Sequence, residues 1–309
     1  MPLLDAIRAL ASFQPPPRLP DCDFDLLGHV LEAHGLAPMA SYQLENTRLG
    51  ASVPESLRER LLTSYQGVVN DNVLRLVSLR GALKVVPDVP AILLEAAAYV
   101  DWLYPHMAFR PVLGVRLAVR AADGARFAKG VEGLLSVART EHHGRTAVFT
   151  DGRIELVLQE GLWQGAAEDG LLYERRTPYP AFGPSAARPA AEEALLATVA
   201  DQALLGLYAP LVTFVDLREL LSLPDLDLDY LRRRADALGL ARALYGAARL
   251  VARFFPEVEA QAAAARPALG LAERVAVARV VETADDPARL SHLRGGEAAA
   301  RLVVAPPAP

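Results

Sequence analysis

Charged residues accompany three short apolar runs, and their types decide which chemistry is open to this chain. Glu95 directly follows the first run, Arg116 lies within the second, and Glu155 lies within the third. Residues two apart on a strand project from the same face, so Gly114 would share a face with Arg116. Carboxylates on such strands can hold a divalent metal ion, whereas a guanidinium binds anions or pairs with a carboxylate.

Other groups of metal-binding residue types have unsuitable spacing. Adjacent histidines on an extended segment point to opposite faces, so His142-His143 predicts a solvated turn. The alternating run Asp225, Asp227 and Asp229 lacks the glycine and distal glutamate of a calcium loop, and it more simply caps a helix. The chain has no glycine-rich phosphate loop and no nucleophile motif.

The composition bounds the class of protein. A chain of 309 residues, 52% hydrophobic and 22% charged, can bury a large core. A net charge of -5 argues against a general nucleic-acid-binding surface, which needs a dense basic patch. Cys22 is the only cysteine, so an internal disulfide and a cysteine-based zinc site are excluded. Without a signal peptide or an apolar run long enough for a bilayer, we expect a soluble, cytoplasmic protein.

Helical and strand-like patterns divide the chain into successive regions. We expect an N-terminal helical layer at 1–84, an α/β core at 85–176, a proline-rich linker at 177–190, a helical region at 191–300 and a disordered tail at 301–309. In the first region one helix starts at Phe24 and ends near Gly35 and Pro38. A second helix follows Pro54 and continues to Leu83, with a break expected at Gly67.

The core region alternates strands and helices. We expect a buried strand at Ile92–Leu94, a helix from Glu95 to about Tyr104, a strand at Val112–Val119 and a helix at Ala125–Val137. Asp151-Gly152 between two β-rich runs predicts a hairpin. Beyond the linker, helical spacing recurs in five stretches, 191–207, 212–221, 227–238, 241–254 and 269–281.

Several motifs in this order resemble those of a known family. Leu93–Ala96 stands where the family has L-L-K-G, and Tyr104-Pro105 follows where its helix ends near Tyr-Pro. Arg110–Arg116 stands where R-P-x-x-D-I-D is expected. Leu211–Leu217 and Leu228–Tyr230 resemble the C-terminal W-L-x-D-L and a later L-D-W. Together they resemble the uncharacterised bacterial nucleotidyltransferases of the polymerase β-like superfamily, over roughly residues 25 to 255.

The resemblance implies an α+β fold, a small mixed sheet of four or five strands wrapped by helices. It also implies what the site has lost. The family's two aspartates, which with a third carboxylate hold divalent metal for nucleotidyl transfer, are replaced by Gly114 and Arg116. The family's lysine is replaced by Glu95. Glu155 stands where the third carboxylate is expected, although a solvated strand residue would fit that position equally well.

The changes reverse charge at positions that the family places close together. We therefore expect Arg116 to pair with Glu155, Glu95 or both, within about 4–6 Å; independent drift on an unused surface is the alternative. Arg110, kept with its proline, could meet a nucleotide's phosphates. We favour a bracing role, against Asp101 or a backbone carbonyl.

Three functions remain open. The leading one is a catalytically degenerate nucleotidyltransferase-like protein, which binds an unknown protein partner and needs no cofactor. The alternative is an active nucleotidyltransferase with a rearranged site, which would need Mg²⁺, an NTP and carboxylates drawn from Glu95, Asp101 and Glu155. The third is a sensor that binds a nucleotide or another small anion through arginines without chemistry.

Overall fold

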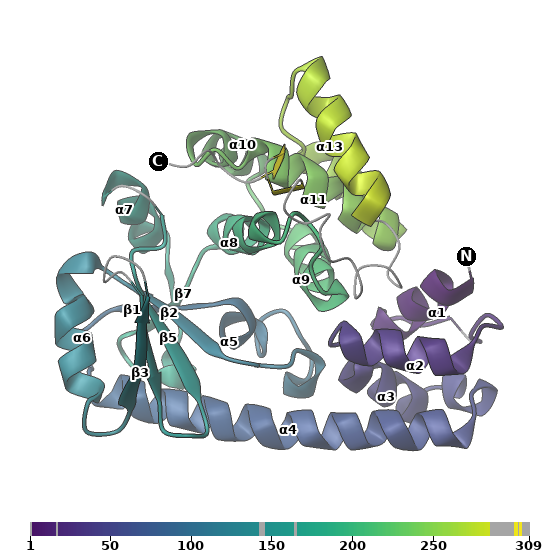
Figure 1. Cartoon of the computed structure of the whole chain (residues 1–309), viewed down its shortest axis with the longest axis horizontal. Helices are drawn as coiled ribbons and strands as arrows, with labels where there is room; N and C mark the ends of the chain where they lie inside the picture. Colours follow the sequence, from purple (N-terminus) through teal and green to yellow (C-terminus); the bar gives the residue numbers. More distant parts are fainter. Residues whose placement is uncertain are drawn as a thin grey trace. The chain divides into compact units, whose positions relative to one another are not determined.

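The computed structural model describes residues 2–16, 18–141, 146–163, 166–284, 300–301 and 303–304 (Figure 1). The chain divides into two compact units. The first comprises Met1–Val68, Ala108–Arg110 and Leu195–Pro309, and the second comprises Val69–Met107 and Pro111–Ala194. The domain boundaries expected from the sequence stay a prediction. No helix in the described ranges combines the length and the apolar character needed to cross a membrane.

The described part of the first unit is built from helices. Near the N-terminus α1 (Pro2–Ala11), α2 (Phe24–Ala33) and α3 (Ala37–Asn46) pack against one another. The predicted end of α2 is confirmed at Gly35, whose φ of 70° lies in the left-handed region that favours glycine. Pro38 was expected to help end that helix, but it lies in the first turn of α3, where proline is well tolerated.

The C-terminal helices of this unit pack around α11 (Ala241–Phe254). Its buried residues recur every three or four positions, as a helix with one apolar face requires. Its neighbours are α9 (Leu211–Leu221), α10 (Leu228–Ala237), α12 (Glu259–Ala265) and α13 (Leu271–Ala284). All but α12 were predicted. Asp227 caps α10 through a hydrogen bond from the Tyr230 amide, which confirms the capping interpretation of that acidic run.

Two helices begin in one unit and end in the other. Helix α4 (Glu55–Lys84) continues without interruption through Gly67, where a break had been expected. An isolated glycine lowers helix propensity by only about 1 kcal/mol relative to alanine, too little to end a helix of this length. Helix α8 (Ala191–Leu204) confirms the helix predicted at the same start.

The second unit contains a mixed seven-stranded sheet within the described residues, in the order β3-β4-β5-β2-β1-β7-β6. The strands β1 (Ala91–Leu94) and β2 (Val115–Val119) are antiparallel neighbours, and β2 pairs in parallel with β5 (Glu155–Glu160). Figure 1 shows α5 (Glu95–Tyr99) and α6 (Gly124–Val131) on opposite sides of these strands. The α+β class is therefore confirmed, with a larger sheet than the four or five strands expected.

The hairpin predicted at Asp151-Gly152 is confirmed, because β4 (Thr146–Thr150) pairs antiparallel with β5. The strand β3 (Ser136–Glu141) was missed because the helical spacing seemed to extend to Val137. That helix ends at Val131, before the poor helix former Gly133. His142 and His143 lie outside the described residues.

Regular structure also lies at the end of the expected core and within the expected linker at 177–190. Residues 166–174 form α7 (Ala166–Glu174), while β6 (Thr177–Pro178) and β7 (Ala186–Arg188) extend the sheet. Pairing of β7 with β1 is parallel and that of β6 with β7 antiparallel. Such short strands are invisible to periodicity, since two or three residues show no pattern.

Two glycines of the first unit provide a test of local packing. An added methyl group at Gly50 would lie 2.2 Å from the backbone oxygen of Leu44, whereas at Gly67 it would meet nothing within 4 Å. We expect Gly50→Ala to lower the free energy of unfolding by about 1–3 kcal/mol. Gly67→Ala should raise it by about 0.5–1 kcal/mol, because alanine favours a helix interior. Urea unfolding followed by circular dichroism measures both, and shifts of the same sign would contradict this packing.

Candidate functional site

The four predicted site positions lie on or directly beside the adjacent strands β1, β2 and β5 of the second unit. Arg116 of β2 lies opposite Leu94 of β1 and Val157 of β5. Glu155 lies two residues before Val157 and therefore on the same face as Arg116. A methyl group at Gly114 would lie 3.6 Å from the backbone oxygen of Glu155, so these two positions also adjoin.

Arg116 forms the ion pair that its charge reversal predicts. Its Nη1 lies 2.5 Å from Oε1 of Glu95, and its Nε donates to Oε1 of Gln159 over 3.2 Å. The Arg116 side chain is 20% exposed and that of Glu95 is 39% exposed, so the pair is partly shielded from water. Glu95 is thus a carboxylate partner of Arg116, and Glu155 is exposed at the start of β5.

Gln159 was not recognised from the sequence. Gln159 lies on β5, opposite Ala118 of β2 and two residues beyond Val157. It therefore faces the same side of the sheet as Arg116. The only available signal was this alternation, which needs the parallel pairing of β2 and β5 to be known first. Arg116 of β2 therefore has partners on both sides, Glu95 directly after β1 and Gln159 on β5.

The backbone at Glu95 is unusual for a residue with a side chain. Its φ is 51°, in the left-handed region that costs a non-glycine residue about 1–2 kcal/mol. It follows directly after β1, where the chain turns into the short helix α5. Strain of this kind persists only where surrounding contacts over-determine it, and here the Arg116 pair is such a contact.

These residues do not fit a divalent metal ion. Gly114 has no side chain to offer a ligand atom, and the guanidinium of Arg116 repels a cation. Within the described ranges, no three residues among histidine, cysteine, aspartate and glutamate are grouped so that they could hold a metal. No catalytic step is therefore derived through a metal here.

Arg110 lies in the first unit and is engaged in a buried ion pair. Its Nε is 3.0 Å and 2.9 Å from the two carboxylate oxygens of Asp216 on α9, and its Nη2 is 2.9 Å from Oδ2. The two side chains are 9% and 1% exposed. Arg110 therefore braces its loop, as expected, but its carboxylate partner is Asp216 and not the suggested Asp101. A partner 106 residues away cannot be predicted from local sequence pattern.

Asp101 lies instead in a different charged group, within the second unit. Burial raises the pKa of Asp101 above its usual value, although Arg188 and Arg80 pull it down. The Arg188 guanidinium stacks over Trp102, 3.8 Å from the ring centre, and burial lowers the pKa of Arg188. Sequence reasoning missed both residues. A hollow of about 270 Å³, largely apolar, is lined by Arg80 and Asp101 among others.

Comparison with known proteins agrees with this arrangement of motifs. A family model described as uncharacterised nucleotidyltransferase matches residues 20–256, most of the chain. No curated protein matches significantly. No solved structure matches significantly either.

The buried pair of Arg110 and Asp216 predicts a large effect on stability. Asp216→Ala leaves a buried guanidinium without its carboxylate, so we expect the free energy of unfolding to fall by about 3–5 kcal/mol. The matched control is Glu45→Ala, which removes an exposed pair with Arg58 in the same unit and should cost at most about 1 kcal/mol. Chemical denaturation of both variants decides it, and equal losses would contradict a burial effect.

The strained backbone at Glu95 predicts an unusual order of stabilities. Glu95→Ala and Glu95→Gly both remove the ion pair with Arg116, so their difference isolates the backbone. Because glycine adopts a φ of 51° freely, the glycine variant should be more stable than the alanine variant by about 1 kcal/mol. Thermal unfolding of the pair tests this; an alanine variant at least as stable as the glycine variant would show that no strain is stored.

Proposed function

Because the chain belongs to the family of uncharacterised nucleotidyltransferases, we propose that it is a catalytically degenerate member, acting as a binding or partner protein rather than as an enzyme. The observation that carries the proposal is the Arg116–Glu95 ion pair. The resemblance to the family implies a metal-binding aspartate where this chain has Arg116, and a lysine where it has Glu95.

Electrostatics supports this interpretation in two ways. A triphosphate with its metal needs carboxylates facing the cation and positive charge facing the phosphates. Here each of the two charged positions carries the opposite sign, and the two side chains neutralise one another over 2.5 Å. Releasing either one to meet a nucleotide would cost the pair and leave the other unmatched in a partly shielded place.

The alternative of an active enzyme with a rearranged site needs carboxylates other than the family's pair. Glu95 is engaged with Arg116, while Asp101 lies beside Arg188 and Arg80. Glu155 is exposed and occupies the position expected of the third carboxylate. Of these three carboxylates, Glu155 is the one that stands where the family resemblance implies a metal-binding carboxylate, so its removal separates the two functions.

We expect the purified protein to show no metal-dependent nucleotidyl transfer. Incubation with each of the four NTPs and Mg²⁺ or Mn²⁺ should give neither turnover nor a mass increase on the protein or on protein acceptors. Thermal stabilisation by an NTP without turnover would assign a nucleotide-binding role, and no response would assign a scaffold role. Turnover that is lost in Glu155→Ala but retained in the matched control Glu132→Ala would overturn the proposal.

A restored site provides the complementary control. The triple variant Glu95→Lys, Gly114→Asp and Arg116→Asp returns the residue types that the family resemblance implies at these three positions. If the three positions account for the loss of the metal site, the folded triple variant should bind Mn²⁺ at least tenfold more tightly than the natural chain in calorimetry. A folded triple variant with unchanged Mn²⁺ affinity would place the loss elsewhere.

A further inference from the structure

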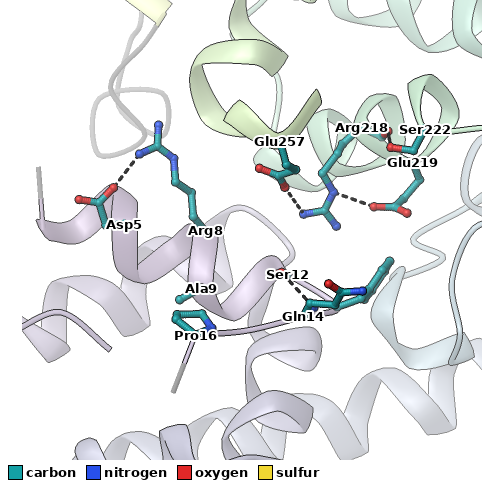
Figure 2. A pocket seen from close by; sticks show the side chains of 11 residues that line it. Asp5, Arg8, Ala9, Ser12, Gln14, Pro16, Arg218, Glu219, Ser222 and Glu257 are labelled. Atoms are coloured by element: carbon teal, nitrogen blue, oxygen red, sulfur yellow. Dashed lines mark hydrogen bonds and ion pairs between the residues drawn. The ribbon is translucent and has the colours of Figure 1, made fainter. Parts of the chain in front are cut away.

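A hollow of about 580 Å³ lies within the first unit, among α1, the bend that follows it, α9 and Glu257 (Figure 2). This volume is within the usual range for a small-molecule site. The polar side chains of the lining come from elements far apart in the sequence. They are Asp5, Arg8, Ser12, Gln14, Arg218, Glu219, Ser222 and Glu257.

Arg218 is the unusual member of this lining. Its side chain is only 3% exposed, and its guanidinium carbon lies 5.3 Å from the ring centre of Phe13 and 4.8 Å from that of Phe255. Figure 2 shows it reaching from α9 towards Gln14, with Glu219 and Glu257 on either side. A guanidinium so deeply placed needs a partner for each of its donors.

Two of the three nitrogens of this guanidinium have partners. Nε donates to Oε1 of Glu219 over 2.6 Å, and Nη1 donates to the backbone oxygen of Ala11 over 2.8 Å and lies 3.5 Å from Glu257. Nη2 is buried and has no hydrogen-bond partner among the described residues. An unsatisfied buried donor costs about 1–3 kcal/mol, more when it is charged, so an acceptor supplied from outside would recover that energy.

The charges of the lining restrict what that acceptor can belong to. Arg8 is already engaged, with Nη1 2.6 Å from Asp5 and Nε donating to the backbone oxygen of Phe254 over 2.7 Å. Its charge is therefore matched, while Glu219 and Glu257 share the single positive charge of Arg218. A nucleotide's phosphates would be repelled here. A neutral ligand with both an acceptor and a donor would not.

The geometry of Arg218 and Glu219 specifies the pattern of those groups. Nε and Nη2 lie on one edge of the planar guanidinium, and Glu219 accepts from Nε. A ligand acceptor that meets Nη2 is thereby brought beside the Glu219 carboxylate, which can accept from a neighbouring N–H. Burial raises the pKa of Glu219 despite the opposing pull of Arg218, as expected for a carboxylate held away from water.

We propose that this hollow binds a small uncharged molecule through an amide edge, with its carbonyl accepting from Nη2 of Arg218 and its adjacent N–H donating to Glu219. A nucleobase lactam and a primary carboxamide share this edge. Because Nη2 is covered in the unliganded protein, binding displaces a covering group. Phe13 is the candidate, because it is only partly buried in the bend after α1, whereas Phe255, the nearer ring, is buried.

Calorimetry with uncharged ligands tests the proposal. We expect at least one of two ligand classes to bind: the lactams guanosine and uridine, or the carboxamide nicotinamide. The class that binds shows whether the amide edge belongs to a nucleobase or to a carboxamide. For a lactam the matched ligands are 1-methylguanosine and 3-methyluridine; for the carboxamide it is N,N-dimethylnicotinamide. Each keeps the carbonyl but loses the N–H, and should bind at least tenfold more weakly. Equal binding by the matched pair, or no binding by any parent compound, would overturn the proposal.

Variants locate the site independently of the ligand's identity. In Glu219→Gln the amide oxygen replaces the carboxylate at Nε of Arg218, which turns the NH₂ group towards the ligand's N–H. Affinity should fall at least tenfold, while Glu259→Gln, an exposed residue outside the lining, should leave it unchanged. Binding unaffected by Glu219→Gln would also overturn the proposal. These ligands carry no phosphate, so the result is separate from that of the nucleotide assay.

Discussion

The buried pair of Arg110 and Asp216 is the constraint from which much of the chain's course follows. Removing two charges from water is costly, and the cost is recovered only when the geometry is close and both groups are fully bonded. The double contact of Nε and Nη2 with one carboxylate meets that condition. Residues 108–110 consequently belong to the first unit although the chain on both sides of them belongs to the second.

Met107 and Val112, on either side of residues 108–110, are hydrogen-bonded within the second unit. The side chain of Asn72, fully buried on α4, donates to the backbone oxygen of Met107 over 2.7 Å and accepts from the backbone N–H of Val112 over 2.9 Å. Arg75 donates to the carbonyl of Val112 from the next turn. The chain therefore enters β2 from a defined point, and the register of β2 decides which face Arg116 occupies.

What the sequence could and could not predict follows from the range of the interactions. The strand β1, the Asp-Gly hairpin and five of the helices beyond the expected linker depend on local pattern, so they could be predicted. The Arg116–Glu95 pair could be anticipated because the family resemblance implies reversed charges at two neighbouring positions. Gln159 and Asp216 could not, since the first requires the strand pairing and the second lies 106 residues from its partner.

Two buried arginines of the first unit differ in a way that bears on ligand binding. One edge of the Arg110 guanidinium donates to both oxygens of Asp216, so that edge has no donor left for an external anion. Arg218 lies two residues beyond Asp216 on α9. On the same edge of its guanidinium, Nε donates to one oxygen of Glu219 and Nη2 has no hydrogen-bond partner among the described residues. An arginine already saturated stabilises the fold, whereas one with a buried spare donor gains energy from a ligand. A ligand acceptor that meets Nη2 of Arg218 would therefore complete a hydrogen-bond set that folding leaves unfinished.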